Sequence, residues 1–213
     1  MTDRLRAIEK RAAAEGLSLM GHCDDDEGPG SLVLLGAGPG FWPVFRTSPE
    51  TLDGQPDPVD RWSVRVVTAI AADFGAQPVF PFGGPPYAPF LRWAVATGRA
   101  FQSPVGMLVH DQMGMMISYR GALRLSDRLP PPVMGDSPCL TCLDRPCTTA
   151  CPVDALSADH AYDLAACHGY LDTPPGLDCM TRGCAVRRAC PVSAGAARTE
   201  AQSELHMEAF HPR

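Results

Sequence analysis

Eight cysteines between Cys139 and Cys190 constrain this chain more than any other feature of its sequence. They form two runs of four, and each run ends in a Cys-Pro step. Sets of four thiolates are the ligands of tetrahedral metal sites and of iron–sulfur clusters, and a segment this dense in cysteine folds around what it binds. The first run is Cys139, Cys142, Cys147 and Cys151-Pro152, and the second is Cys167, Cys179, Cys184 and Cys190-Pro191.

The compartment decides between metal ligation and disulfide bonds. Residues 1–16 lack the apolar core and cleavage pattern of a signal peptide, and no apolar run approaches the ~18–20 residues of a membrane span. We therefore expect a cytoplasmic protein with no membrane partner. In the cytoplasm, clustered cysteines bind metal more often than they form disulfide bonds. The net charge of −6 disfavours nucleic acid as a partner, because an acidic surface repels phosphates.

The cysteine pattern resembles that of the bacterial two-cluster ferredoxins, in which C-x2-C-x2-C-x3-C-P occurs twice and the fourth cysteine of each run ligates the other cluster. The resemblance implies two [4Fe-4S] clusters. This chain departs from the pattern in the longer step from Cys142 to Cys147 and in the loose second run. Carried over residue by residue, one cluster takes Cys139, Cys142, Cys147 and Cys190, and the other takes Cys151, Cys167, Cys179 and Cys184.

Other interpretations of the cysteines stay open. Two zinc sites of four cysteines each would use the same ligands, but zinc sites are usually built from separate C-x2-C pairs without the terminal Cys-Pro. Disulfides are the remaining alternative. Cys23 lies outside both runs and is interpreted as a plain thiol. Three arginines lie among the later cysteines: Arg182, Arg187 and Arg188. They could tune the reduction potential of a cluster or dock an acidic partner, and the alternative is that they form a solvated helix face.

The residues before the cysteines predict a separate packed domain. Apolar periodicity predicts helices over 4–15, 58–74 and 90–98, with Asp57 capping the second. Apolar runs predict strands over 31–37 and 78–82, and a hairpin over 106–125 that turns at 111–114. After the stiff Pro130-Pro131-Pro132 linker the metal-organised segment begins. The predicted fold class is therefore α+β, with a mixed or antiparallel sheet domain at 1–133 and a small ferredoxin-like domain at 134–213.

Several short motifs resemble the epoxyqueuosine reductase family and, in the first domain, the CblC-type cobalamin-processing proteins. Residues 103–110 and 114–121 resemble the cobalamin-facing hairpin of both families, and residues 57–60 resemble a short CblC-type motif. Residues 167–171 resemble the isolated fifth cysteine of the reductases, in its Cys-x-x-Tyr-Leu context. The resemblance implies a nitroreductase-like domain followed by two clusters, with cobalamin as a cofactor.

The resemblance also implies a cofactor pocket walled by the predicted hairpin. Its apolar lining would be Met107, Met115 and Ile117, and Tyr119 and Arg120 would supply polar contacts. The chain departs from the reductases at 81–85, where Pro-Phe-Gly-Gly-Pro lacks the acidic residue that the reductases carry before a Gly-Pro step. This departure argues against epoxyqueuosine reduction itself.

These observations predict an oxidoreductase that moves electrons through two [4Fe-4S] clusters to a cofactor in the first domain. That cofactor is cobalamin, or less favourably a flavin, and the activity would be that of a cobalamin-linked reductase. The alternative is a plain electron carrier whose first domain only docks a partner. In both cases we expect a redox partner protein, and in the first also a small-molecule cofactor or substrate.

Overall fold

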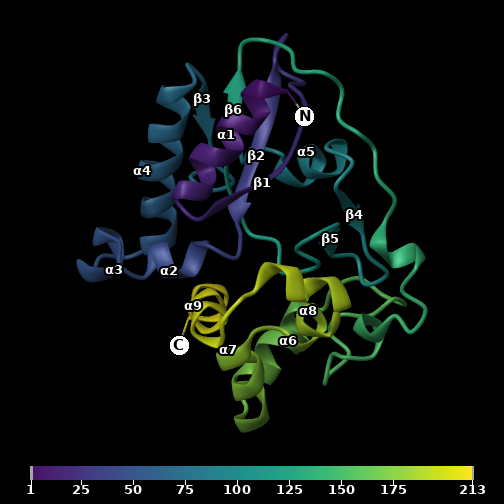
Figure 1. Cartoon of the computed structure of the whole chain (residues 1–213). Helices are drawn as coiled ribbons and strands as arrows, with labels where there is room; N and C mark the ends of the chain where they lie inside the picture. Colours follow the sequence, from purple (N-terminus) through teal and green to yellow (C-terminus); the bar gives the residue numbers. More distant parts are fainter. Residues whose placement is uncertain (1, 213) are drawn as a thin grey trace. The chain divides into compact units, whose positions relative to one another are not determined.

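The structure is a computed structural model that describes residues 2–212 (Figure 1). The chain divides into two compact units. The N-terminal unit comprises residues 1–100 and 118–136, and the C-terminal unit comprises 101–117 and 137–213. Segment 101–117, which the sequence placed in the first domain, therefore clusters with the cysteine-rich residues.

A four-stranded antiparallel sheet organises the N-terminal unit, in the order β1-β2-β6-β3. Every residue of the second strand, predicted over 31–37, is buried, as expected of a strand covered on both faces. The antiparallel sheet and its helices confirm the α+β class. The strands are β1 (Leu17–Asp24), β2 (Ser31–Ala37), β3 (Gln77–Val79) and β6 (Tyr119–Leu125).

Helices pack against this sheet (Figure 1). The first begins after Thr2, whose hydroxyl accepts a hydrogen bond from the Leu5 amide at 3.3 Å. The longest buries Trp62, Val66 and Ile70, three residues of the predicted apolar face. Asp57 is its N-cap residue, as predicted, but with a φ of 52° its side chain makes no capping hydrogen bond. The helices are α1 (Asp3–Ala14), α2 (Phe41–Phe45), α3 (Pro49–Leu52), α4 (Pro58–Asp73) and α5 (Phe90–Ala96).

The predicted hairpin over 106–125 forms only at its turn, where an antiparallel bridge joins His110 and Gly114; the two halves do not pair further. Its first half forms β5 (Leu108–His110), which pairs with β4 (Ala100–Gln102) instead. Its second half, β6, pairs with β2 and β3. The chain is diverted near Gly114, whose φ is +55°, and the amide of Met115 then donates to Ser193 Oγ at 3.0 Å. The alternating apolar residues had suggested one continuous ribbon, but each half finds a different partner.

The C-terminal unit consists mostly of short helices. Its main apolar cluster mixes β4–β5 residues such as Val105 and Val109 with Cys147, Val186 and Cys190. The helices are η1 (Pro138–Leu140), η2 (Pro146–Thr148), α6 (Leu164–Leu171), η3 (Pro174–Gly176), α7 (Leu177–Arg182), α8 (Ala185–Ala189), η4 (Pro191–Ala196) and α9 (Glu200–Phe210). Such short elements bury little apolar surface by themselves, so bound metal is the expected source of further stability.

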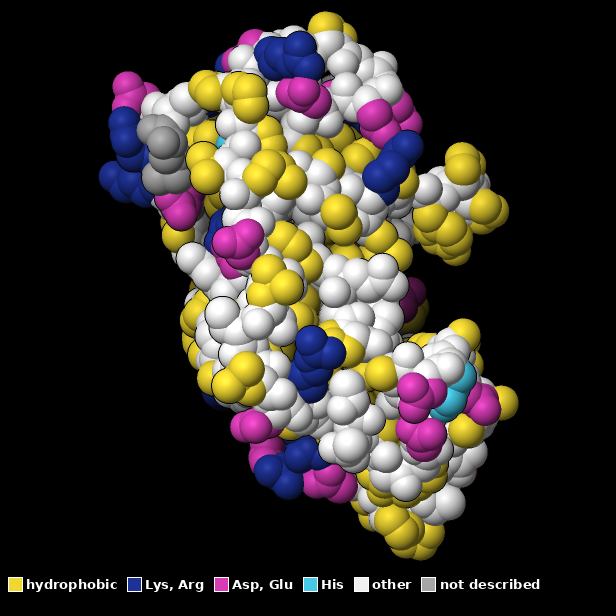
Figure 2. Space-filling model, turned by 90° about the vertical axis from the view of Figure 1, so that its right-hand side faces the viewer, with side chains coloured by type: hydrophobic (Ala, Val, Ile, Leu, Met, Phe, Trp, Pro, Cys, Tyr) yellow, Lys and Arg dark blue, Asp and Glu magenta, His cyan; other side chains and the backbone are white. Residues whose placement is uncertain are grey.

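Over residues 2–212, no helix combines the length and the apolar character needed to cross a membrane. Basic and acidic side chains are interspersed on the face seen in Figure 2. Many of them form ion pairs within the N-terminal unit, for example Arg65 with Glu50 at 2.6 Å and Arg11 with Asp73 at 2.8 Å.

Candidate metal centres

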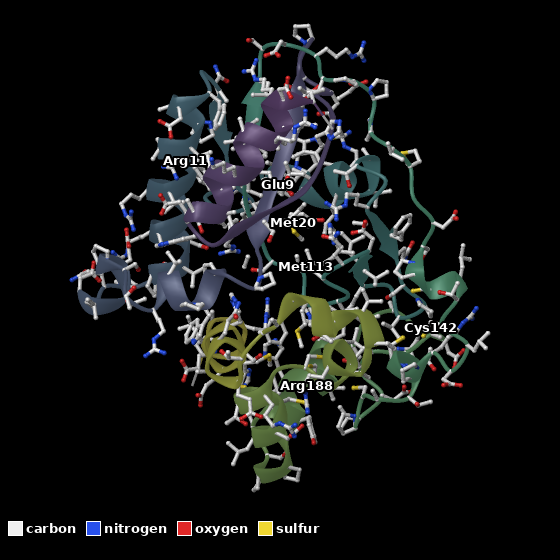
Figure 3. All side chains as sticks on the ribbon, in the orientation of Figure 1. Glu9, Arg11, Met20, Met113, Cys142 and Arg188 are labelled. Carbon is white, nitrogen blue, oxygen red and sulfur yellow. The ribbon has the colours of Figure 1, made fainter. Side chains whose placement is uncertain are left out.

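Four cysteines line one cavity of the C-terminal unit, which we call cavity I and whose volume is about 440 Å³. Three of them come from the first run and one comes from the end of the second. Figure 3 shows Cys142 on the loop between η1 and η2. The remaining lining is mostly apolar and includes Val109 and Met115. The four ligating candidates are Cys139, Cys142, Cys147 and Cys190.

The other four cysteines line a second cavity, cavity II, of about 170 Å³. Here three residues come from the second run and one comes from the end of the first. Helices α6 and α7 carry two of them, and the N-terminus of α8 carries a third. The four are Cys151, Cys167, Cys179 and Cys184. Both sets equal the sets that the ferredoxin-like pattern implied, although ligation itself stays a prediction.

The local backbone explains why each thiol arrives at its cavity. Ser137 accepts a hydrogen bond from the amide of Cys139 and begins η1. Asp163 caps α6 by accepting from the Ala166 amide at 2.9 Å. Gly183, with a φ of +86°, ends α7 and lets the chain turn between two cavity II cysteines.

Helix α8 connects the two cavities. Its N-cap residue is Cys184, which lines cavity II, and its C-cap residue is Cys190, which lines cavity I. Between them Val186 is fully buried, lines cavity II and belongs to the apolar cluster of Cys147 and Cys190. Five helical residues therefore fix the spacing of one ligand in each set.

The space between the thiols tests which group they can hold. Zinc with four thiolates has metal–sulfur distances of about 2.3 Å, which leaves no cavity between the ligands. Each set of four instead lines a cavity, of about 170 Å³ or about 440 Å³, together with other side chains. Among residues 2–212, no group of three or more His, Cys, Asp or Glu side chains was found that could hold a metal ion. All-thiol donors with apolar walls fit an iron–sulfur cluster.

Burial raises the pKa of one thiol in cavity I and of two thiols in cavity II. For Cys147 burial is the main cause, and the neighbouring Cys139 and Cys190 add to it. Burial also raises the pKa values of Cys167 and Cys179. Thiolates that repel one another in an apolar cavity need a bound cation, and a metal centre supplies the charge that reverses this trend.

The ninth cysteine, Cys23, is buried in β1. Burial, with smaller contributions from Asp26, Asp24 and Asp25, raises the pKa of its thiol to about 11. A thiol that stays protonated at neutral pH is a poor nucleophile and a poor ligand. The interpretation of Cys23 as a plain thiol therefore agrees with its surroundings.

The structure divides the five predicted pocket residues between the two units. Met107 lines cavity II and Met115 lines cavity I, so both belong to the cysteine sites. Ile117 is half-buried at the end of the same segment. Tyr119 and Arg120 begin β6 and line a hollow in the N-terminal unit.

This hollow, of about 680 Å³, is walled mainly by Pro81 to Arg92. Arg120 reaches into its lining, and its Nη1 lies 3.1 Å from Asp60 Oδ1 on α4. Burial raises the pKa of Asp60, which the Arg120 charge opposes, and burial lowers the pKa of Arg120. The sequence named Arg120 but missed its carboxylate partner, because nothing in the pattern relates α4 to β6.

The polar lining of cavity II was only partly visible in the sequence. Arg187 lines this cavity, whereas Arg182 and Arg188 form ion pairs with Asp178. Tyr162 lines it too and was missed. The one available signal was helical spacing, because Arg187 follows Cys184 by three residues and lies near it on one side of α8.

Comparison with known proteins supports the fold. A scan of protein-family models and a search of curated proteins each found no match. Among solved structures, the epoxyqueuosine reductase from Streptococcus thermophilus is similar to this chain over 91% of this chain and 67% of that one. The TM-score is 0.50 and the sequence identity is 14%. At this identity the likeness concerns the fold alone.

Proposed function

We propose that this chain is an iron–sulfur redox protein with one [4Fe-4S] cluster in each cavity. The observation that carries the proposal is the gathering of the cysteines: each cavity is lined by four, three from one run and the fourth from the other. In proteins of the two-cluster type, this interleaving places two clusters near each other. The cavity volumes and the all-thiol donor set support clusters over single zinc ions.

Each cluster, when bound, accepts and donates single electrons. The chain supplies the thiols and a largely apolar surround that limits water, including Val105, Val109 and Val186. Met115 and Met107 add polarizable side chains to the walls of cavities I and II. Hydrogen bonds, charge and solvent exposure around the sulfurs set the potentials of such centres.

We further propose that the hollow of the N-terminal unit binds the electron-accepting cofactor, a cobalamin or less favourably a flavin. Its support is the family resemblance of the sequence, the fold likeness to an epoxyqueuosine reductase, and the half-buried Arg120 in a concave lining. We do not include reduction of a queuosine precursor in this proposal, because residues 81–85 lack the acidic residue of the reductases.

A plain electron carrier is the second candidate. The observation that favours it is the placement of Met107 and Met115, which line the cysteine cavities rather than a cofactor pocket. In that case the N-terminal unit would serve as a docking surface for a redox partner protein.

The first experiment measures metal content. Protein purified or reconstituted without oxygen should be brown and contain about eight irons per chain, as two cubanes require. Colourless protein that holds zinc after the same treatment would contradict the cluster proposal.

The second experiment separates the two candidate functions. Cobalamin and flavin are each titrated into the cluster-loaded protein, and binding is read from a shift of the cofactor's visible spectrum. Arg120→Ala should weaken binding, whereas Arg124→Ala is the matched control, since Arg124 is on the same strand and pairs with Asp25 and Glu27. If neither cofactor binds, the plain carrier is the better description.

A further inference from the structure

The two cavities differ in the charges that line them. Cavity I has one charged lining residue besides its cysteines, Asp144, with Thr141 as its polar neighbour. Cavity II has two arginines, Arg187 and Arg198, together with His206, Tyr162, Tyr170 and Ser203. Reduction adds one negative charge to a cluster, so a fixed cation favours the reduced form and a carboxylate disfavours it.

Arg187 is the arginine whose charge is directed at cavity II without an acidic partner. Arg182 is shared between Asp178 at 3.0 Å and Glu200 at 3.0 Å. Arg188 also pairs with Asp178, and it donates to the Gly183 carbonyl at 3.0 Å. Among residues 2–212, no such ion pair is found for the half-buried Arg187, which lines cavity II together with Cys184 and Tyr162.

Tyr162 adds a polar group to the same cavity. Its phenol and Cys167, one of the four cavity II thiols, both line the cavity, and the hydroxyl can donate a hydrogen bond to a ligand sulfur there. A hydrogen bond donated to a ligand sulfur withdraws negative charge from the cluster and favours its reduced form. Arg187 and Tyr162 therefore act in the same direction on the same centre.

Arg198 contributes less to this difference. Its Nη2 donates to the carbonyl of Met116 at 3.1 Å, so part of its hydrogen-bonding capacity is used within the lining. Arginine stays charged at any physiological pH, so the asymmetry between the cavities does not depend on titration.

We propose that Arg187 and Tyr162 hold the cluster of cavity II at a higher reduction potential than the cluster of cavity I, so that electrons pass from I to II. This inference rests on the proposed two-cluster function. In the transfer, one electron leaves the reduced cluster I, which becomes oxidised, and enters the oxidised cluster II. A low-potential one-electron donor must first reduce cluster I, and dithionite serves in the assay.

The test is an anaerobic spectroelectrochemical titration of the full-length, cluster-loaded protein, followed by the loss of visible cluster absorbance. The wild type should show two one-electron steps. Arg187→Gln should lower the potential of the higher step by about 59 mV, which for one electron is a tenfold change in the reduction equilibrium. The potential of the lower step should stay unchanged. Arg187→Lys should keep the higher step close to its wild-type potential, because lysine keeps the charge.

Two further variants sharpen the assignment. Tyr162→Phe should lower the same step by less, since it removes one hydrogen bond and no charge. Arg182→Gln is the control: it removes one positive charge from the neighbouring helix, but that arginine is half-exposed and already paired with acids. It should leave both steps unchanged. The Tyr162→Phe result also stands if Arg187→Gln fails to load its clusters.

The outcomes separate this inference from the proposed function. If iron content and visible spectrum show two cubanes but the variants move the lower step, both steps equally or neither, the inference is overturned and the two-cluster function stands. If the wild type cannot hold two cubanes, the proposed function fails and this inference fails with it.

Discussion

Gly114 provides a direct test of the finding that segment 101–117 packs with the cysteine-rich residues of the C-terminal unit. The glycine has a φ of +55°, and a Cβ built on it would lie 2.3 Å from the amide nitrogen of Ser193 and 2.6 Å from its Cα. Ser193 lies in η4, whose N-cap is Cys190, so a side chain at 114 pushes directly on the segment that carries a cavity I cysteine. Gly106, in the same segment, has a φ of +76° and open space around its would-be Cβ.

The two glycines separate strain from steric overlap. Alanine at either position costs about 1–2 kcal/mol for its left-handed backbone. At Gly114 the overlap involves backbone atoms, which cannot move like a flexible side chain, and overpacking of this kind costs about 1–3 kcal/mol more. We therefore expect Gly114→Ala to lose about 2–5 kcal/mol and Gly106→Ala about 1–2 kcal/mol.

The assay follows loss of visible cluster absorbance in urea after a fixed anaerobic incubation, because unfolding with release of clusters is governed by a rate. With a urea dependence of about 1–3 kcal/mol per molar, the extra cost at Gly114 should lower the midpoint by about 1 M relative to Gly106→Ala. Equal midpoints for the two variants would refute the packing of Gly114 on Ser193 and with it the support that this segment gives to cavity I.

Two further predictions concern the ligands and the N-terminal unit. Cys190→Ser should reduce iron from about eight to about four per chain and leave the same residual electron paramagnetic resonance spectrum as Cys147→Ser, although the two cysteines belong to different runs; a spectrum matching Cys184→Ser instead would contradict the crossed sets. The Arg65 guanidinium lowers the pKa of Glu50 to about 2, so the pair's stabilisation is present above the ordinary glutamate pKa and is lost as pH falls from about 4.5 towards about 2. Because Arg65 is half-exposed, Glu50→Gln should cost about 1 kcal/mol at pH 6 and less at pH 3, measured by urea unfolding of tryptophan fluorescence, whose reporters all lie in the N-terminal unit.

Much of the N-terminal unit was predictable because its signals are local. The apolar run at 31–37 is β2, residue for residue, and the periodic face over 58–74 is the buried side of α4. The strand predicted over 78–82 is shorter, and Leu91 of the predicted helix over 90–98 is exposed. These deviations arise at the edges of elements, where packing rather than propensity decides.

The hairpin failed for a different reason. The alternation of apolar and polar residues over 106–125 predicts that both halves are strands with one buried face. It does not predict which strand each half pairs with. The segment between the two halves instead contacts Ser193, which is far away in sequence. By contrast, the cysteine sets were implied by the resemblance to two-cluster ferredoxins, and the same residues line each cavity in the structure. The place of Arg187 and Tyr162 in the lining of cavity II could be found only from the structure, because sequence alone does not distinguish a residue that lines a cavity from a solvated one.

The interleaving of the two runs has a consequence for the order of synthesis. Cavity II has all four of its thiols once Cys184 has been made, and cavity I must wait for Cys190, one short helix later. The first run, although translated earlier, cannot complete a set by itself. A nascent chain that ends before Cys184 thus has neither complete set, and the two sets become complete only six residues apart. Insertion of clusters is therefore expected as a late, nearly all-or-none step of maturation.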